Sequence, residues 1–345
     1  MKPGKIRVSV LVSCEYDSNH LNNLVDDLLR QDYPSELLEI ILIGEEGKDV
    51  NNTNIQYYAT EYQGVEFVRS PGKSVPQGIN LGIQQSQGDV IIILDNNVRC
   101  YKDLVSEIVQ KFRDKEIDCV YGNSMLTAST QGIVQLAIKE CLSSAYGNWD
   151  SYLRSLKSFK EDFTHPFGCY RRSCFDVAGH FSEELPEAYY EDYFERMSAK
   201  NLRVVICPEI KIIRYVPETV SKLAAMELRN SYYKPLLLRI NSKATSVRNI
   251  FAPVFVFLLL ILWTAGLFYQ LYLLMFFGIF LVYFIYGFLR SIASYKHYRK
   301  FGLLGIMPYV YFIVHGSSGW GYLTGILRYW LRFKIPKVRR LSINL

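Results

Sequence analysis

The sequence predicts an α/β fold with a mostly parallel sheet, followed by C-terminal membrane helices. Over residues 1–210, short apolar runs alternate with helical patterns, as is typical of a parallel sheet covered by helices on both faces. Residues 249–289 then contain no charged side chain, and such a stretch is long enough for two membrane crossings. We therefore expect an α/β domain in the cytosol and a membrane-embedded part after it.

The first elements follow from residue periodicity. The β-branched run at 6–12 predicts a buried strand. Residues 21–29 carry leucines at helical spacing, with Asn19 as the expected cap, and this helix should stop at residues 32–34. Further strands are expected at 38–43, 66–68 and 89–94, with a helix starting over 78–84.

Acidic side chains follow three of the predicted strands. Glu15 follows the first strand, Glu45 the second, and Asp95 ends the apolar run Val-Ile-Ile-Ile-Leu. Ligands of parallel sheets bind beyond the carboxyl ends of the strands, so these residues should converge on one edge. Aspartate is also a common turn former, which is the structural alternative for Asp95.

Composition excludes several other classes. The net charge of +6 is mild, and basic residues cluster around the apolar C-terminal segments, which suits anionic lipid head groups rather than nucleic acid. The seven cysteines are scattered without a C-x-x-C pair, so we predict free thiols and neither a zinc site nor a disulfide framework. The apolar run at 6–12 is too short for a signal-peptide core, so no signal peptide is expected.

The C-terminal third predicts two or three membrane segments. One span is expected near 250–268 and a second near 271–289, with a reversal at Tyr269-Gln270. A buried hairpin of a soluble protein is the alternative, but it would need a polar face. The segments are expected to be a cytosolic domain at 1–218, interfacial helices at 219–248, a transmembrane hairpin at 249–289, and a basic loop, third segment and basic tail at 290–345.

The third apolar stretch, 301–327, differs from the first two. It contains Pro308, and Ser317, Gly321 and Gly325 have the small-residue spacing of close helix packing. Basic residues flank it on both sides, and positive flanks favour the cytosol. We expect a re-entrant or interfacial segment, with a third span as the alternative.

Short motifs also occur in a fixed order along the chain. They are Ser9 to Val12, Leu29 to Pro34, Glu39 to Ile43, Asn80 to Ile83, Gly88 to Asn97, Gly168 to Arg172, Gly179 to Phe181 and Glu191-Asp192. This order and spacing resembles an inverting family 2 glycosyltransferase with a GT-A fold. The apolar tail with His315-Gly316 is similar to the succinoglycan-biosynthesis type, which is anchored in the membrane.

The resemblance implies a reaction and a place in the cell. It implies transfer of a sugar from a nucleotide-sugar, with UDP-sugar favoured, to a polyprenyl-diphosphate-linked saccharide in polysaccharide or glycan assembly. It also implies integral placement in the inner or plasma membrane, contact with membrane lipids, a catalytic domain that faces the cytosol, and no nucleic-acid partner.

The resemblance further implies roles for individual residues. Asp192, beside Glu191, would be the base that deprotonates the acceptor hydroxyl. The D-x-D metal motif appears as Asp95-Asn96-Asn97, so Asp95 and Asn97 would hold Mn²⁺ or Mg²⁺, although an amide oxygen contributes less charge than a carboxylate. Donor-binding residues are expected to be Ser13, Glu15, Glu45, Lys73 and Asp95, and acceptor-binding residues Arg171 and Arg172.

Two other functions stay open, and several of these side chains have simpler interpretations. Lys73 and the pair Arg171-Arg172 are equally well read as solvated surface charge. A solvated acidic turn is the structural alternative for Glu191-Asp192, but the tyrosines and Phe194 on both sides favour a half-buried catalytic pocket. A polyprenyl-phosphate sugar synthase would take a phosphate acceptor and depend little on a base. A non-catalytic membrane-bound GT-A-like protein is favoured only by the neutral Asn97.

Overall fold

The computed structural model describes residues 5–14, 20–45, 49–70, 74–144, 146–147, 167–241 and 250–331. The chain divides into two compact units, Met1–Glu218 and Thr219–Leu345.

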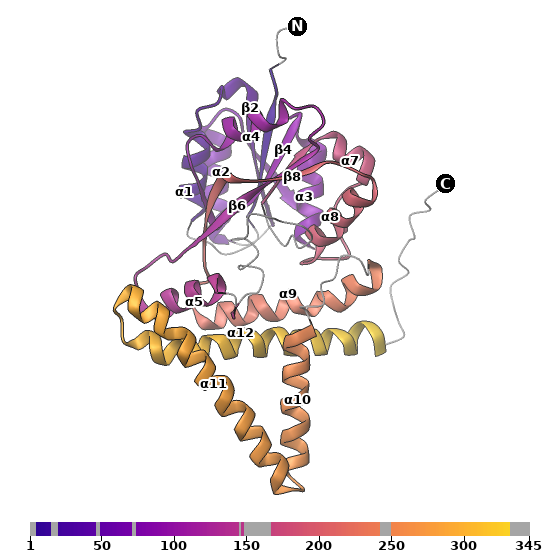
Figure 1. Ribbon diagram of the computed structural model, residues 1–345. Coiled ribbons are helices and arrows are strands. Elements are labelled where there is room, and N and C mark those ends of the chain that lie inside the picture. Colours follow the sequence, from indigo (N-terminus) through magenta and orange to yellow (C-terminus); the bar gives the residue numbers. More distant parts are fainter. Residues whose placement is uncertain are drawn as a thin grey trace. The chain divides into compact units, whose positions relative to one another are not determined.

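The strands described in the first unit form one eight-stranded sheet (Figure 1). Its order is β3-β2-β1-β4-β7-β6-β8-β5. The first four pair in parallel, β7 is antiparallel to β4 and β6, β6 and β8 are parallel, and β5 is antiparallel to β8. The strands are β1 (Val8–Ser13), β2 (Leu38–Glu45), β3 (Val65–Ser70), β4 (Val90–Asp95), β5 (Val98–Cys100), β6 (Cys119–Thr127), β7 (Gly168–Arg171) and β8 (Val204–Tyr215).

The parallel half forms around two central strands, β1 and β4, that are buried on both faces. All six residues of β1 and all six of β4 are buried, and central parallel strands are normally covered on both sides. The mostly parallel α/β sheet predicted from the sequence is confirmed, and the four predicted strands are present with ends shifted by a few residues.

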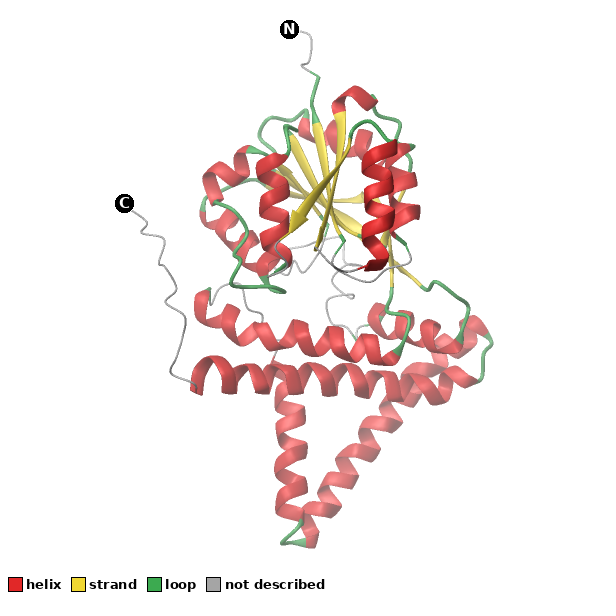
Figure 2. Ribbon diagram, turned by 180° about the vertical axis from the view of Figure 1, so that it is seen from behind, coloured by secondary structure: helices red, strands yellow, loops and turns green. Residues whose placement is uncertain are grey.

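Helices cover both sides of the twisted sheet (Figure 2). α1 begins after His20 and buries Leu21, Leu24 and Leu28, while the expected cap Asn19 lies outside the described residues. α3 approaches the sheet closely, because a Cβ on Gly82 would lie 2.7 Å from Cδ1 of Ile43. The helices are α1 (Leu21–Leu29), α2 (Asp49–Glu61), α3 (Val75–Gln85), α4 (Leu104–Phe112), α5 (Ile133–Ser143), α7 (Ser173–Ala178) and α8 (Tyr189–Ala199), with a 3₁₀ turn at Ser35–Leu37.

The main apolar core lies on one face of the sheet. Alternate strand residues such as Val10 and Ile92 pack there against Leu24 of α1 and Phe112 of α4. This burial stabilises the parallel strands and fixes the edge at which their carboxyl ends meet.

The second unit contains α9 (Val220–Ile240), α10 (Phe251–Gly266), α11 (Gln270–Tyr298), α12 (Gly302–Ile326) and a π-helical turn at Leu327–Leu331. The reversal predicted at Tyr269-Gln270 is confirmed, since α11 begins directly after Tyr269. α11 continues beyond the predicted end at Leu289 to Tyr298. Charged residues such as Arg290 and Lys296 end the uncharged stretch but not the helix.

Of the helices that the structure describes, α11 is long and apolar enough to cross a membrane, with a mean hydropathy of 2.2 over its most apolar window. α10 is apolar but shorter. Many large side chains of both helices are exposed, including Phe251 and Phe257 of α10 and Leu274 of α11. The assignment of these helices to a membrane stays a prediction.

α12 is one continuous helix despite Pro308. Its glycines permit close packing, because a Cβ on Gly321 would meet the carbonyl of Leu228 on α9. A Cβ on Gly325 would likewise meet the carbonyl of Tyr232. The predicted small-residue packing is therefore found at both glycines, and Ser318 adds a 2.8 Å hydrogen bond to Glu227 of α9.

Candidate functional site

The carboxyl ends of the parallel strands meet at one edge of the sheet. Ser13 of β1 lies opposite Asp95 of β4, and the last residues of β2 and β3, Glu45 and Ser70, are paired. The structure thus brings Ser13 and Asp95 together. Glu15 and Lys73 lie outside the described residues, as does the side chain of Glu45.

Asp95 is buried and forms an ion pair that the sequence analysis missed. Its Oδ2 lies 2.8 Å from an NH1 nitrogen of Arg214, and the two side chains are 11% and 16% exposed. Arg214 reaches this position because β8 pairs with β5, which places it opposite Val98. In the sequence, Arg214 is only a basic residue near the end of an apolar run. No motif surrounds it that would have marked it as part of the site.

Polar atoms without hydrogen-bond partners gather around this pair. Among the described residues, the buried Ser13 Oγ, Asn97 Oδ1, and Arg214 Nε and NH2 have no hydrogen-bond partner. Each such buried group costs about 1–3 kcal/mol. A concentration of these atoms at one strand edge indicates a place where a polar ligand completes the hydrogen bonding.

The donor atoms at this edge fit a divalent cation. Carboxylate and amide oxygens are ligands that Mg²⁺ and Mn²⁺ prefer, and Asn97 Oδ1 is buried and accepts no hydrogen bond from any described residue. Within the described ranges, no group of three His, Cys, Asp or Glu side chains is placed to hold a metal. The protein alone would therefore supply few ligands, and phosphate oxygens and water would complete the shell, as is common for Mg²⁺.

Aromatic and charged side chains flank the same edge. The ring of His20 stacks on Tyr215, the residue after Arg214, with centroids 3.7 Å apart, and burial lowers the pKa of His20. Arg99 grips Asp27 with both Nε and NH2, the latter at 2.8 Å. These contacts hold β5 and β8 beside Asp95.

Asp192 lies in the first turn of α8 and is buried, with 5% of its side chain exposed. Its Oδ2 accepts a 2.8 Å hydrogen bond from Nε of Arg196. The other Arg196 nitrogens donate to the carbonyls of Ala178 and His180. Arg196 thereby fixes the orientation of the Asp192 carboxylate. Glu191 is half-buried beside it.

Packing links α8 to α3. Tyr193 of α8 packs against Phe181, with ring centroids 4.5 Å apart. Asn80 of α3 exchanges two hydrogen bonds with the backbone of Phe181, at 2.9 and 3.0 Å. Because α3 lies against β1, β2 and β3, Asp192 belongs to a segment tied to the parallel strands.

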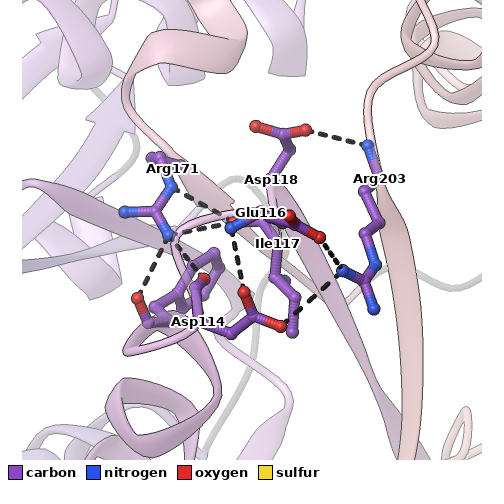
Figure 3. Close-up of polar contacts among 7 residues, drawn as sticks. Asp114, Glu116, Ile117, Asp118, Arg171 and Arg203 are labelled. Atoms are coloured by element: carbon purple, nitrogen blue, oxygen red, sulfur yellow. Dashed lines mark hydrogen bonds and ion pairs between the residues drawn. The ribbon is translucent and has the colours of Figure 1, made fainter.

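Arg171 and Arg172 are placed differently from what the sequence suggested. Arg171 pairs with Val90 at the start of β4, so it lies roughly 17 Å along the strand from Asp95. Its guanidinium donates to the carbonyls of Phe112, Asp114 and Ile117 (Figure 3).

Arg172 is engaged in the same way. It donates to the carbonyls of Ile83, Ser86 and Gly88. The structure therefore does not bring either arginine to the edge that carries Asp95. Both side chains hold loops at the opposite edge, and an acceptor-binding role for Arg171 and Arg172 stays a prediction.

Comparison with known sequences finds one family. Residues 9–178 match the family model Glycosyl transferase family 2. Glycosyltransferase GlyG of Streptococcus pneumoniae serotype 4 (strain ATCC BAA-334 / TIGR4) is 23% identical over 155 residues, which cover 41% of this chain and 51% of GlyG. The chain thus spans about half the length of this curated relative.

Solved structures share the fold. Mannosyltransferase PcManGT from Pyrobaculum calidifontis, in complex with GDP-Man and Mn²⁺, has a TM-score of 0.54 and 15% identity, over 92% of this chain and 88% of its own. S. aureus TarS has a TM-score of 0.47 and 15% identity, over 70% of this chain and 44% of TarS. The PcManGT likeness and the family match identify the α/β unit as a GT-A-like fold.

Proposed function

We propose that this glycosyltransferase, whose residues 9–178 form a glycosyl transferase family 2 domain, moves a sugar from a nucleotide-sugar to a lipid-linked saccharide. The observation that carries the proposal is the buried edge around Asp95, where Ser13, Asn97 and Arg214 present polar atoms that have no hydrogen-bond partner among the described residues. Such an edge beyond parallel strands is where this class of sheet binds its ligands.

The donor is a nucleotide-sugar, with UDP-sugar favoured by the sequence resemblance. PcManGT, which shares the fold, was solved with GDP-Man. This supports a nucleoside-diphosphate sugar as the donor, whether its base is uracil or guanine. Ser13 and Asp95 line the proposed donor site, and Glu15, Glu45 and Lys73 are proposed to complete it.

Mn²⁺ or Mg²⁺ is the proposed cofactor, held by Asp95 and Asn97. When bound, a divalent ion supplies positive charge that stabilises the departing nucleoside diphosphate. The buried Asn97 Oδ1, which has no hydrogen-bond partner in the described part of the chain, supports this assignment, as does the Mn²⁺ in PcManGT.

Asp192 is the proposed base of an inverting transfer. Its carboxylate accepts the proton of the acceptor hydroxyl while the hydroxyl oxygen attacks the anomeric carbon and the nucleoside diphosphate leaves. Arg196 holds the carboxylate in one orientation. Glu191 is proposed to influence Asp192 through its neighbouring negative charge.

The acceptor is proposed to be linked to polyprenyl diphosphate in the inner or plasma membrane. The exposed apolar side chains of α10 and α11 support membrane association, and a polyprenyl chain resides in the bilayer. The domain would face the cytosol, where nucleotide-sugars are found. A succinoglycan-type pathway is the sequence-based expectation for its product.

A donor panel tests the proposal. The full-length protein, in lipid nanodiscs with an extract of acceptor lipids, is incubated with UDP- and GDP-sugars and Mn²⁺, and nucleoside diphosphate release is measured. We expect release with one donor, and loss of release in Asp95→Ala. Release from no donor would favour a non-catalytic protein, and release that requires a polyprenyl phosphate without a saccharide would favour a polyprenyl-phosphate sugar synthase.

A further inference from the structure

The guanidinium of Arg214 makes a hydrogen bond through one of its three nitrogens, and the other two have no partner among the described residues. The NH1 nitrogen is bound to Asp95 at 2.8 Å. Within the described part of the chain, the buried Nε and NH2 atoms have no hydrogen-bond partner. These two nitrogens lie on the same side of the planar group, so their N–H bonds form the parallel pair that grips a carboxylate or phosphate.

Other arginines of this unit show what that edge normally does. Arg99 uses Nε and NH2 to hold both oxygens of Asp27. In Arg171 and Arg172 the same two nitrogens donate to backbone carbonyls. The open edge of Arg214 is thus a departure from the rule that buried donors are satisfied.

The ligand that fits this edge is an anion with two oxygens on one centre. A carboxylate or phosphate provides this geometry, and Arg is the side chain best suited to it. Asp95 already neutralises much of the guanidinium charge, so an isolated small anion gains little there. A nucleoside diphosphate brings further anchoring through its base and ribose.

We propose that Arg214 is a donor-binding residue that grips the diphosphate of the nucleotide-sugar through Nε and NH2 while NH1 remains on Asp95. The inference deepens the proposed function and rests on it. Arg214 then has two roles: it orients Asp95, and it places a fixed positive charge beside the leaving group. A divalent ion held by Asp95 would supply positive charge to the leaving group in addition to that of Arg214.

Binding measurements test the proposal without relying on turnover. The full chain in nanodiscs is titrated with UDP and GDP by calorimetry, and with uridine and guanosine by saturation-transfer NMR. Arg214→Gln should weaken nucleoside diphosphate binding about 10- to 100-fold, the value of a charge-assisted hydrogen-bond pair. Nucleoside binding should stay within about twofold of wild type, because a nucleoside carries no phosphate.

Two variants control for folding. Arg203→Gln removes an exposed arginine that pairs with Glu116 at the other end of β8, and it should leave both ligands unaffected. Arg214→Lys keeps the charge and one contact to Asp95 but lacks the fork, so it should recover only part of the affinity. If Arg214→Gln fails to fold, Arg214→Lys carries the test alone.

The outcomes separate the two claims. Unchanged diphosphate affinity in a folded Arg214 variant, or an equal loss for diphosphates and nucleosides, contradicts the role of Arg214 and leaves the proposed function intact. A wild-type protein that binds neither UDP nor GDP contradicts the proposed function and this inference together.

Discussion

The neutral Asn97 is the residue at which this site departs most from a two-carboxylate metal motif. Its Oδ1 is buried and has no hydrogen-bond partner among the described residues, so a carboxylate oxygen at this position would be available to ligate a cation. Asn97→Asp should tighten Mn²⁺ binding about tenfold in the presence of nucleoside diphosphate, because a carboxylate is the stronger hard ligand. Electron paramagnetic resonance titration of Mn²⁺ measures this.

The matched control for the metal test is Asp103→Asn, which removes a carboxylate at the start of α4. It should leave Mn²⁺ affinity unchanged. Weaker binding in Asn97→Asp would exclude Asn97 as a ligand position.

Asp192 provides the test of general-base catalysis. Asp192→Asn preserves shape and the contact with Arg196 but cannot accept a proton. Single-turnover transfer should fall by about 10²–10⁴, a typical general-base contribution, while calorimetry should find donor affinity little changed. Glu191→Gln should lower the single-turnover rate less than Asp192→Asn does.

A rate within a few-fold of wild type in Asp192→Asn would exclude Asp192 as the base. It would favour Glu191 or a phosphate acceptor, which is already ionised.

Arg172 should matter for stability rather than for acceptor binding. Arg172→Gln removes buried hydrogen bonds to the carbonyls of Ile83, Ser86 and Gly88, and unsatisfied buried carbonyls cost about 1–3 kcal/mol each. We expect a Tm lower by about 5 °C or more and an unchanged KM for the acceptor. A raised acceptor KM at normal Tm would restore the role suggested by the sequence.

At the residue scale, the sequence predicted side chains that follow strands and missed those that arrive from elsewhere. Asp95 was predictable because it ends an apolar strand. Its partner Arg214 was not, because the pairing depends on β8 lying beside β5, a contact between segments over 100 residues apart. Arg171 looked like a free cation because one sequence does not show that carbonyls surround it.

At the scale of elements, helix packing in the second unit depends on glycine. Gly325 lies against the carbonyl of Tyr232 and the ring of Pro235, whereas a Cβ on Gly305 of the same helix would meet nothing within 4 Å. Gly325→Leu should force α12 away from α9 and lower the temperature at which the full-length protein loses helical circular dichroism. Gly305→Leu is the matched control and should leave that temperature unchanged. Equal effects would contradict the packing role.

The predicted elements were those with a strong local pattern. β1, β2 and β4 each contain at least three consecutive apolar residues, and α1 has regular leucines. The antiparallel strand β7 was not expected as a strand, because its four residues Gly168–Arg171 are too few to show alternation. α11 was predicted too short because the end of the uncharged stretch was taken as the end of the helix, and a helix tolerates charges at its end.

At the scale of the whole molecule, α10 and α11 should anchor the protein in a membrane. The full-length protein should remain in the pellet after carbonate extraction, because α11 is long enough to cross a bilayer. A chain truncated after residue 246 should be released, or retained only by its charged surface at low salt. Full-length protein in the soluble fraction without detergent would contradict the anchorage.

The central claim, transfer of a sugar from a nucleotide to a membrane lipid, is tested most directly by following the sugar. The full-length protein in its own membranes receives nucleotide-sugars labelled in the sugar with ¹⁴C, and the products are partitioned between water and organic solvent. Wild-type protein should move label from one donor into the organic phase as a lipid-linked saccharide identified by mass spectrometry, and Asp95→Ala should move none. Label that appears only as free sugar in water, or equal transfer by Asp95→Ala, would contradict the account.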